Sequence, residues 1–159
     1  MILATGLLVA TVIDLRSRRI PNVLTGGMAA AGLALAAIGA GEVSLAASLV
    51  GLALGLLLML PGYALGATGA GDVKLMAAVG ALLGPTLVVS AFLFTAIAGG
   101  GLAVVVAVRR KRFSATLAQT ARFVTAPAAA PGHIKAAPAM NRFAYGPAIA
   151  VGTLLAVIT

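Results

Sequence analysis

Long apolar runs separated by short polar stretches dominate the sequence. The runs are Met1–Ile13, Val23–Ala40, Val43–Leu60, Val73–Leu83, Thr86–Val108 and Phe143–Thr159. Pro61-Gly62 and Gly84-Pro85 are helix-breaking pairs, and they end the third and fourth runs. Because a helix of about 20 apolar residues crosses the core of a bilayer, the pattern predicts an all-α integral membrane protein with about six transmembrane helices.

Composition strengthens this prediction. The 159 residues are 62% hydrophobic and 9% charged, whereas soluble domains carry about 25% charged residues. At roughly 20 residues per span, little of the chain remains outside the bilayer. We therefore expect residues 1–159 to form a single membrane-embedded domain.

The longest polar stretch, 109–142, begins with the basic run Arg109-Arg110-Lys111-Arg112. Apolar residues then recur at helical spacing within 113–124, which predicts a weakly amphipathic helix on the membrane surface. Three prolines follow between 127 and 138. We interpret 109–142 as a basic loop outside the bilayer.

The distribution of charge predicts the orientation. All eleven Lys and Arg lie in or next to the connections Asp14–Asn22, Leu65–Lys74 and 109–142. With six spans these three connections fall on one side, and the opposite side has no basic residue. The positive-inside rule places the basic side in the cytoplasm and both termini outside. The expected location is the cytoplasmic (inner) membrane, with several passes.

Several chemistries are disfavoured by composition. The net charge of +8 lies near the ends of apolar runs, and only 4% of residues are aromatic, so we expect no nucleic-acid partner. The chain has no cysteine and a single histidine, His133. Thiolate zinc sites, histidine-cluster metal sites and a cysteine nucleophile are therefore excluded, and we expect no metal and no cofactor.

The acidic residues point to the chemistry. There are three, Asp14, Glu42 and Asp72, and two of them lie at boundaries of apolar runs on the predicted cytoplasmic side. Asp14 ends the first run and Asp72 begins the fourth, so both carboxylates lie at similar depth. These two runs are the shortest, which predicts aspartates recessed below the membrane surface. An ionisable group inside a bilayer costs about 2.5–3.5 kcal/mol and is functional by default.

A structural interpretation of each aspartate stays open beside this one. Asp72 before Val73 fits a helix N-cap. Asp14 could instead pair with nearby Arg16, Arg18 or Lys74.

Two carboxylates that face each other in surroundings of low dielectric constant titrate as a unit, and the pair retains one proton near neutral pH. An aspartic protease needs this arrangement, since one member takes a proton from water and the other donates to the scissile carbonyl. Gly69 and Gly71 would let an extended substrate lie close to Asp72. The loop Leu65–Gly71 could also offer unpaired backbone groups to the substrate as an added strand.

At this point the residues resemble a known family. Gly69-Ala70-Gly71-Asp72, followed by Val73-Lys74, resembles the GxGD motif of prepilin peptidases, which are intramembrane aspartyl proteases. Asp14 with Ile20-Pro21-Asn22 resembles the other half of that motif pair, and Tyr145-Gly146-Pro147-Ala148 is similar to the closing motif. The resemblance extends over essentially the whole chain.

The resemblance implies a membrane endopeptidase that cleaves the leader peptide of type IV prepilins at the cytoplasmic face. Asp14 and Asp72 would be its catalytic pair, and the partner would be a precursor with a hydrophobic N-terminal helix. Larger members carry a cysteine-tetrad zinc domain and also methylate the new N-terminus. Without cysteine, this chain is similar to the short, cleavage-only form that serves Flp/Tad-type pilins.

The remaining candidate residues surround the aspartates. The resemblance places Gly69, Gly71, Lys74, Pro21 and Asn22 in the substrate-binding loops. Lys74 would tune the aspartates or touch substrate, or else reach the phosphate headgroups. Alternatives are an archaeal-type preflagellin peptidase or another GxGD protease, and, outside enzymes, a small proton-coupled transporter. Oligomeric state and substrate stay open.

Overall fold

A computed structural model describes residues 1–109 and 145–159 of the chain. The described part is helical throughout and has no strand, so the predicted all-α class is confirmed. The helices are α1 (Ile2–Ser17), α2 (Asn22–Ala37), α3 (Leu45–Ala64), α4 (Ala70–Arg109) and α6 (Gly146–Ile158). The predicted surface helix at 113–124, and all but the start of the predicted basic loop 109–142, lie outside the described residues.

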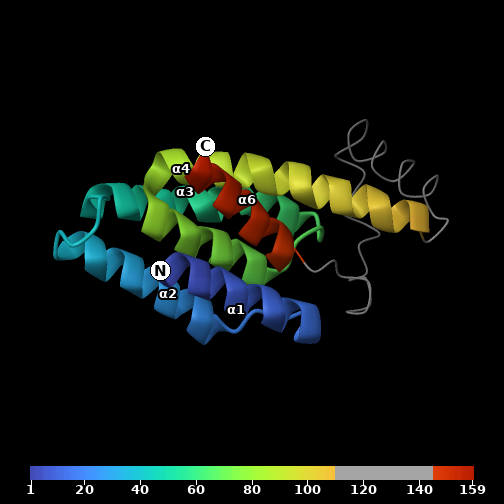
Figure 1. Cartoon of the computed structure of the whole chain (residues 1–159), viewed down its shortest axis with the longest axis horizontal. Coiled ribbons are helices and arrows are strands. Elements are labelled where there is room, and N and C mark those ends of the chain that lie inside the picture. The colour runs from blue at the N-terminus through green and yellow to red at the C-terminus, as the bar shows by residue number, and fades with distance from the viewer. Residues whose placement is uncertain (110–144) are drawn as a thin grey trace.

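α4 folds back on itself at the predicted break. Gly84 has φ 79° and ψ −178°, a conformation that glycine adopts without penalty, and Pro85 follows it. The first arm, 70–83, and the second arm, 85–109, therefore lie side by side, as Figure 1 shows. The same figure shows both chain termini on the side of the bundle away from the end where α4 finishes.

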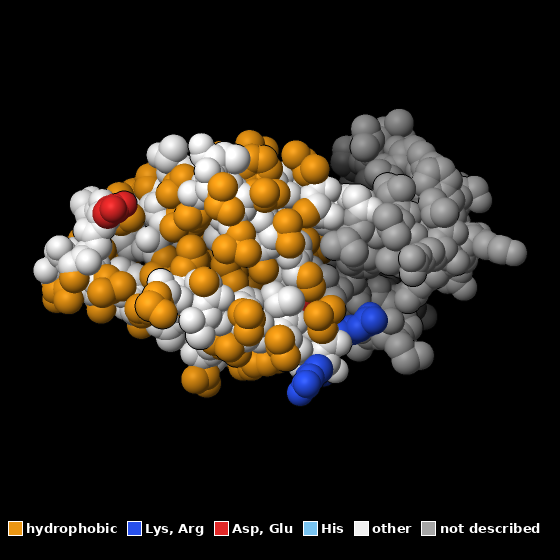
Figure 2. Space-filling model, in the orientation of Figure 1, with side chains coloured by type: hydrophobic (Ala, Val, Ile, Leu, Met, Phe, Trp, Pro, Cys, Tyr) orange, Lys and Arg blue, Asp and Glu red, His pale blue; other side chains and the backbone are white. Residues whose placement is uncertain are grey.

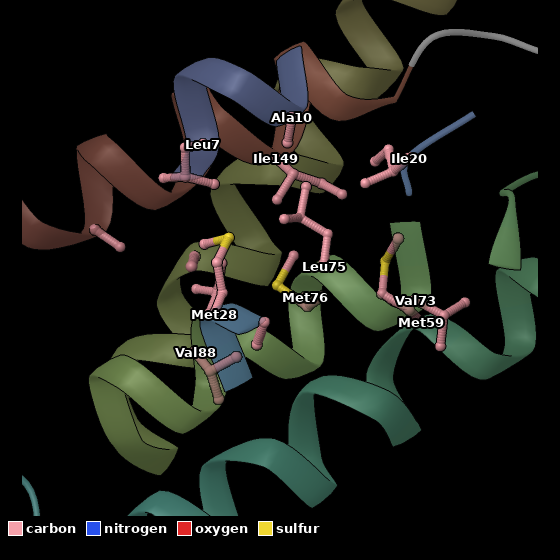
Figure 3. Packing of buried hydrophobic residues seen from close by; sticks show 14 residues of the cluster. Leu7, Ala10, Ile20, Met28, Met59, Val73, Leu75, Met76, Val88 and Ile149 are labelled. Carbon is pink, nitrogen blue, oxygen red and sulfur yellow. The ribbon is translucent and has the colours of Figure 1, made fainter. Parts of the chain in front are cut away.

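The first arm of α4 is the centre of the bundle. It is in contact with α2, α3 and α6, and nearly every residue from Asp72 to Ala81 is buried. A helix that is apolar all round is expected in this position. Figure 3 shows the buried cluster in which Leu75 and Met76 of this arm meet Ile149 of α6 and Met28 of α2.

Small residues let α3 approach this central arm closely. The buried residues of α3 are Ser48, Gly51, Gly55 and Met59. A Cβ added at Gly51 would lie 2.9 Å from the carbonyl carbon of Gly80, and Ser48 Oγ donates to the Ala81 carbonyl at 2.6 Å. Packing of small residues with one interhelical hydrogen bond is the usual way in which membrane helices associate.

The outer surface is largely apolar. Large hydrophobic side chains are exposed on each described helix, including Leu8 of α1, Leu57 of α3 and Leu93 of α4. Figure 2 shows this apolar face, with an acidic side chain at one end and basic side chains at the other. Among the described helices, Leu45–Ala64 and Ala70–Gly101 are long and apolar enough to cross a membrane. Six spans and the orientation of the termini stay predictions.

Several predicted helix ends were wrong. α1 continues one turn beyond Ile13 to Ser17, so Asp14 lies inside the helix. α3 continues through Pro61 to Ala64. Gly66, two residues beyond the end of α3, has φ 72°, and the Ala67 N–H donates to the Gly62 carbonyl at 2.8 Å. This is a Schellman ending, which a left-handed glycine makes possible.

Candidate active site

Asp14 and Asp72 lie in one cavity at the end of the bundle where α1 finishes and α4 begins. Only 5% of Asp14 and 6% of Asp72 is exposed. The cavity has a volume of about 320 Å³. Its lining consists of Asp14, Arg18, Arg19, Ile20, Asn22, Ala67, Thr68, Gly69, Ala70, Gly71, Asp72 and Lys74. The third acidic residue, Glu42, lies in the α2–α3 connection and lines a different cavity.

Asp14 is held by the first residue of α6. The Gly146 N–H donates to Asp14 Oδ2 at 2.8 Å, across 132 positions of sequence. N–H groups at the start of a helix lack partners within the helix and carry partial positive charge, so they suit a carboxylate. A Cβ added at Gly146 would lie 2.9 Å from the same oxygen. Only glycine permits this approach without displacing the carboxylate.

Asp72 is held by the residue before α4. It is the third residue of that helix, and its Oδ2 accepts a hydrogen bond from the Gly69 N–H at 2.8 Å. This is the reciprocal half of a capping box. The expectation that Asp72 is the N-cap itself was therefore wrong by three positions, because α4 begins at Ala70 and not at Val73. Both aspartates are thus bound through Oδ2 to a glycine N–H at the start of a helix.

Gly71 fixes how close the α1–α2 connection comes to α4. A Cβ added at Gly71 would lie 3.1 Å from Ile20 Cβ and 3.4 Å from the Ile20 backbone nitrogen. Ile20 is buried, and the connection turns at Arg18, whose φ is 51°. This contact joins the element that follows Asp14 to the helix turn that carries Asp72.

Lys74 and Asn22 form a second link across the cavity. Lys74 Nζ donates to Asn22 Oδ1 at 2.8 Å, which joins the first arm of α4 to the start of α2. Pro21 precedes α2 in an extended conformation, φ −63° and ψ 138°, and is not part of the described lining. The structure therefore brings Asn22 and Lys74 to the aspartates, whereas Pro21 contributes by starting the helix.

The connection before α4 does not offer free donors in this state. The N–H groups of residues 66–69 all donate within the chain, to carbonyls near the end of α3 or, for Gly69, to Asp72. The expectation that the loop Leu65–Gly71 offers unpaired backbone groups to a substrate strand stays a prediction, and the N–H groups of residues 66–69 are already bonded. Strand addition here would first require these bonds to open.

Tyr145 is a site residue to which sequence reasoning assigned no role. It is the N-cap of α6, directly before Gly146. Its side chain is partly buried and packs against the hydrophobic core cluster. The signal in the sequence was the Tyr145-Gly146-Pro147 motif before the last apolar run.

A family model of the type IV leader peptidase family matches residues 1–104. The match includes both aspartates and every residue that lines their cavity, whereas Tyr145 and Gly146 lie beyond it. The comparisons with curated proteins and with solved structures gave no match.

Proposed function

The chain belongs to the type IV leader peptidase family, and from this premise we propose that it is an aspartic endopeptidase whose catalytic pair is Asp14 and Asp72. Family membership establishes a peptidase of this general type. Together with the two apolar helices, it indicates a membrane protein. The proposal adds the catalytic residues, the mechanism and the orientation.

One observation carries the proposal: both buried carboxylates line a single cavity. Two carboxylates that share a site do not both ionise easily, so one proton is retained by the pair. The ionised member takes a proton from a bound water, which attacks the scissile carbonyl. The protonated member donates to the carbonyl oxygen. The glycine N–H groups hold each carboxylate in place while the proton moves.

We propose that the substrate is the precursor of a type IV pilin of the Flp kind. Its hydrophobic helix lies in the bilayer, and its leader junction reaches the cavity from the cytoplasm. The cationic side chains Arg18, Arg19 and Lys74 line the cavity, and under the positive-inside rule this supports a cytoplasmic location for this end of the bundle. A preflagellin-like precursor would use the same chemistry. A transporter gains no support, because Asp14 and Asp72 share one end and Glu42 lies elsewhere.

The test uses all three acidic residues of the chain. Asp14→Asn and Asp72→Asn keep an oxygen that can accept the glycine N–H but remove the ionisable group. Each should lower the rate of precursor cleavage by about 10²-fold or more, the range expected for a lost general acid or base. The two losses should not add, because the residues act as a unit.

Glu42→Gln is the matched control and should cleave at the wild-type rate, since Glu42 lies outside the aspartate cavity. Cleavage is followed by gel shift of a co-expressed pilin precursor, with each variant's level in the membrane measured alongside. A well-inserted Asp72→Asn variant with near-normal cleavage would overturn the proposed catalytic pair.

A further inference from the structure

A close contact joins the second arm of α4 to the start of α6. The second arm contains Gly99-Gly100-Gly101. A Cβ added at Gly99 would lie 2.6 Å from Cζ of the Tyr145 ring, whereas a Cβ at Gly100 or Gly101 would meet nothing within 4 Å. A methyl group at Gly99 would therefore displace the Tyr145 ring, whereas one at Gly100 or Gly101 would meet no neighbour.

The tyrosine that sits on Gly99 also begins α6. The Tyr145 carbonyl accepts the Ile149 N–H at 3.0 Å, the first hydrogen bond of that helix. The next residue, Gly146, donates its N–H to Asp14 Oδ2 at 2.8 Å. The residue whose ring lies on Gly99 is therefore next in the chain to the residue whose N–H binds Asp14.

A second contact fixes the same two helices further along. A Cβ added at Gly152 would lie 2.7 Å from Thr95 Cα, so α6 and the second arm touch backbone to backbone at this level. Both Thr95 and Thr153 are buried. α6 is therefore in contact with the second arm of α4 at two levels, through Tyr145 at its start and through Gly152 further along.

We propose that Gly99 and Tyr145 are positioning residues, whose contact sets the Gly146 N–H on Asp14 and so places Asp14 opposite Asp72. This inference rests on the proposed function and deepens it, and neither residue is among those that line the aspartate cavity. It assigns a role to one glycine of a three-glycine run and to the tyrosine before the last helix.

The matched pair of variants is Gly99→Ala and Gly100→Ala. Carbon atoms pack at about 3.5–4.0 Å, so a methyl group at Gly99 forces the Tyr145 ring to move by about 1 Å. A misplacement of this size can cost about 10²-fold in rate. We expect Gly99→Ala to lower kcat at least tenfold while KM stays within about threefold. Gly100→Ala adds its methyl group to open space and should match the wild type.

Removing the ring separates positioning from general damage to the fold. The three atoms nearest to a methyl group at Gly99 all belong to the Tyr145 ring. A Tyr145→Ala background removes them, so Gly99→Ala should cost little further activity there, and the two changes should be non-additive. Tyr145→Ala alone should lower kcat, whereas Tyr145→Phe, which keeps the ring, should retain most of it. Unfolding temperatures of the purified variants are measured beside the rates.

Three results would overturn the proposal. The first is a Gly99→Ala enzyme with the wild-type kcat. The second is an equal loss of kcat from Gly99→Ala in the wild-type and in the Tyr145→Ala background. The third is a fall in the kcat of Gly99→Ala that is no larger than the fall in its folded fraction. Should Gly99→Ala fail to fold, Tyr145→Ala against Tyr145→Phe decides alone, because neither introduces a clash. The Asp14→Asn variant distinguishes the failures: if it is inactive while Gly99→Ala is normal, only the positioning role is wrong.

Discussion

Gly71 offers a test of how tightly the distance between the two aspartates is set. Gly71→Ala would place a Cβ 3.1 Å from Ile20 Cβ in the α1–α2 connection. Ordinary contacts between carbon atoms lie at about 3.5–4.0 Å, so Ile20 or the first turn of α4 must give by a few tenths of an ångström. Asp14 precedes this connection and Asp72 follows Gly71 directly. The displacement therefore opens the gap between the two carboxylates.

The expected effects on rate and on stability differ in size. About 1 Å of misplacement can cost 10²-fold in rate, so a shift of a few tenths of an ångström predicts a loss of about threefold to tenfold. Overpacking lowers folding stability by about 1–3 kcal/mol, but replacing a helical glycine by alanine raises it by up to about 1 kcal/mol. The net loss of folding free energy is about 0–3 kcal/mol. Cleavage should fall clearly while the protein stays folded.

The assay is the initial rate of precursor cleavage by purified enzyme, with the unfolding temperature measured on the same preparation. Gly26→Ala is the matched control, because a Cβ at Gly26 in α2 would meet nothing within 4 Å. It should cleave normally. A Gly71→Ala enzyme as fast as wild type would refute the reasoning, as would an equal loss of rate in Gly26→Ala.

Two further predictions concern the bundle and its orientation. In Gly51→Ala the new Cβ would lie 2.8 Å from the Gly84 carbonyl carbon and 2.9 Å from that of Gly80, so α3 and α4 must separate. A thermal unfolding scan should show a loss of about 1–3 kcal/mol in folding free energy. The control Gly27→Ala should unfold as the wild type does. Reporter fusions within 109–142 should read cytoplasmic, and a fusion after Thr159 should read external. A cytoplasmic C-terminus would contradict six spans.

The order of the helices could be predicted from the sequence better than the residues at which they begin and end. Apolar runs are long-range signals, and the break at Gly84-Pro85 follows from backbone chemistry at two residues. The polar residues at the ends were harder to assign. A hydropathy boundary marks where water begins, not where backbone hydrogen bonding stops. For that reason α1 includes Asp14, α4 includes Asp72, and α3 continues through Pro61.

The candidate site, like the fold, could be predicted in part. The charge distribution and the order of the runs predicted that Asp14 and Asp72 lie at one end of the molecule, and the structure has them in one cavity. The groups that hold them were not predictable from spacing. The bond from Gly146 to Asp14 depends on α6 packing against α1, and the contact of Gly71 with Ile20 depends on how the α1–α2 connection turns.

Glycine has a larger part in this site than the substrate-docking interpretation gave it. A buried carboxylate requires hydrogen-bond donors, yet this chain is only 9% charged and offers few polar side chains. The N–H groups at helix starts supply the donors instead, at 2.8 Å from each carboxylate. At Gly146 a Cβ would lie 2.9 Å from the Asp14 oxygen, so a side chain there would displace the carboxylate. The two glycines of Gly69-Ala70-Gly71-Asp72 then have different tasks. Gly69 holds the carboxylate of Asp72, and Gly71 sets the distance from α4 to the connection that follows Asp14.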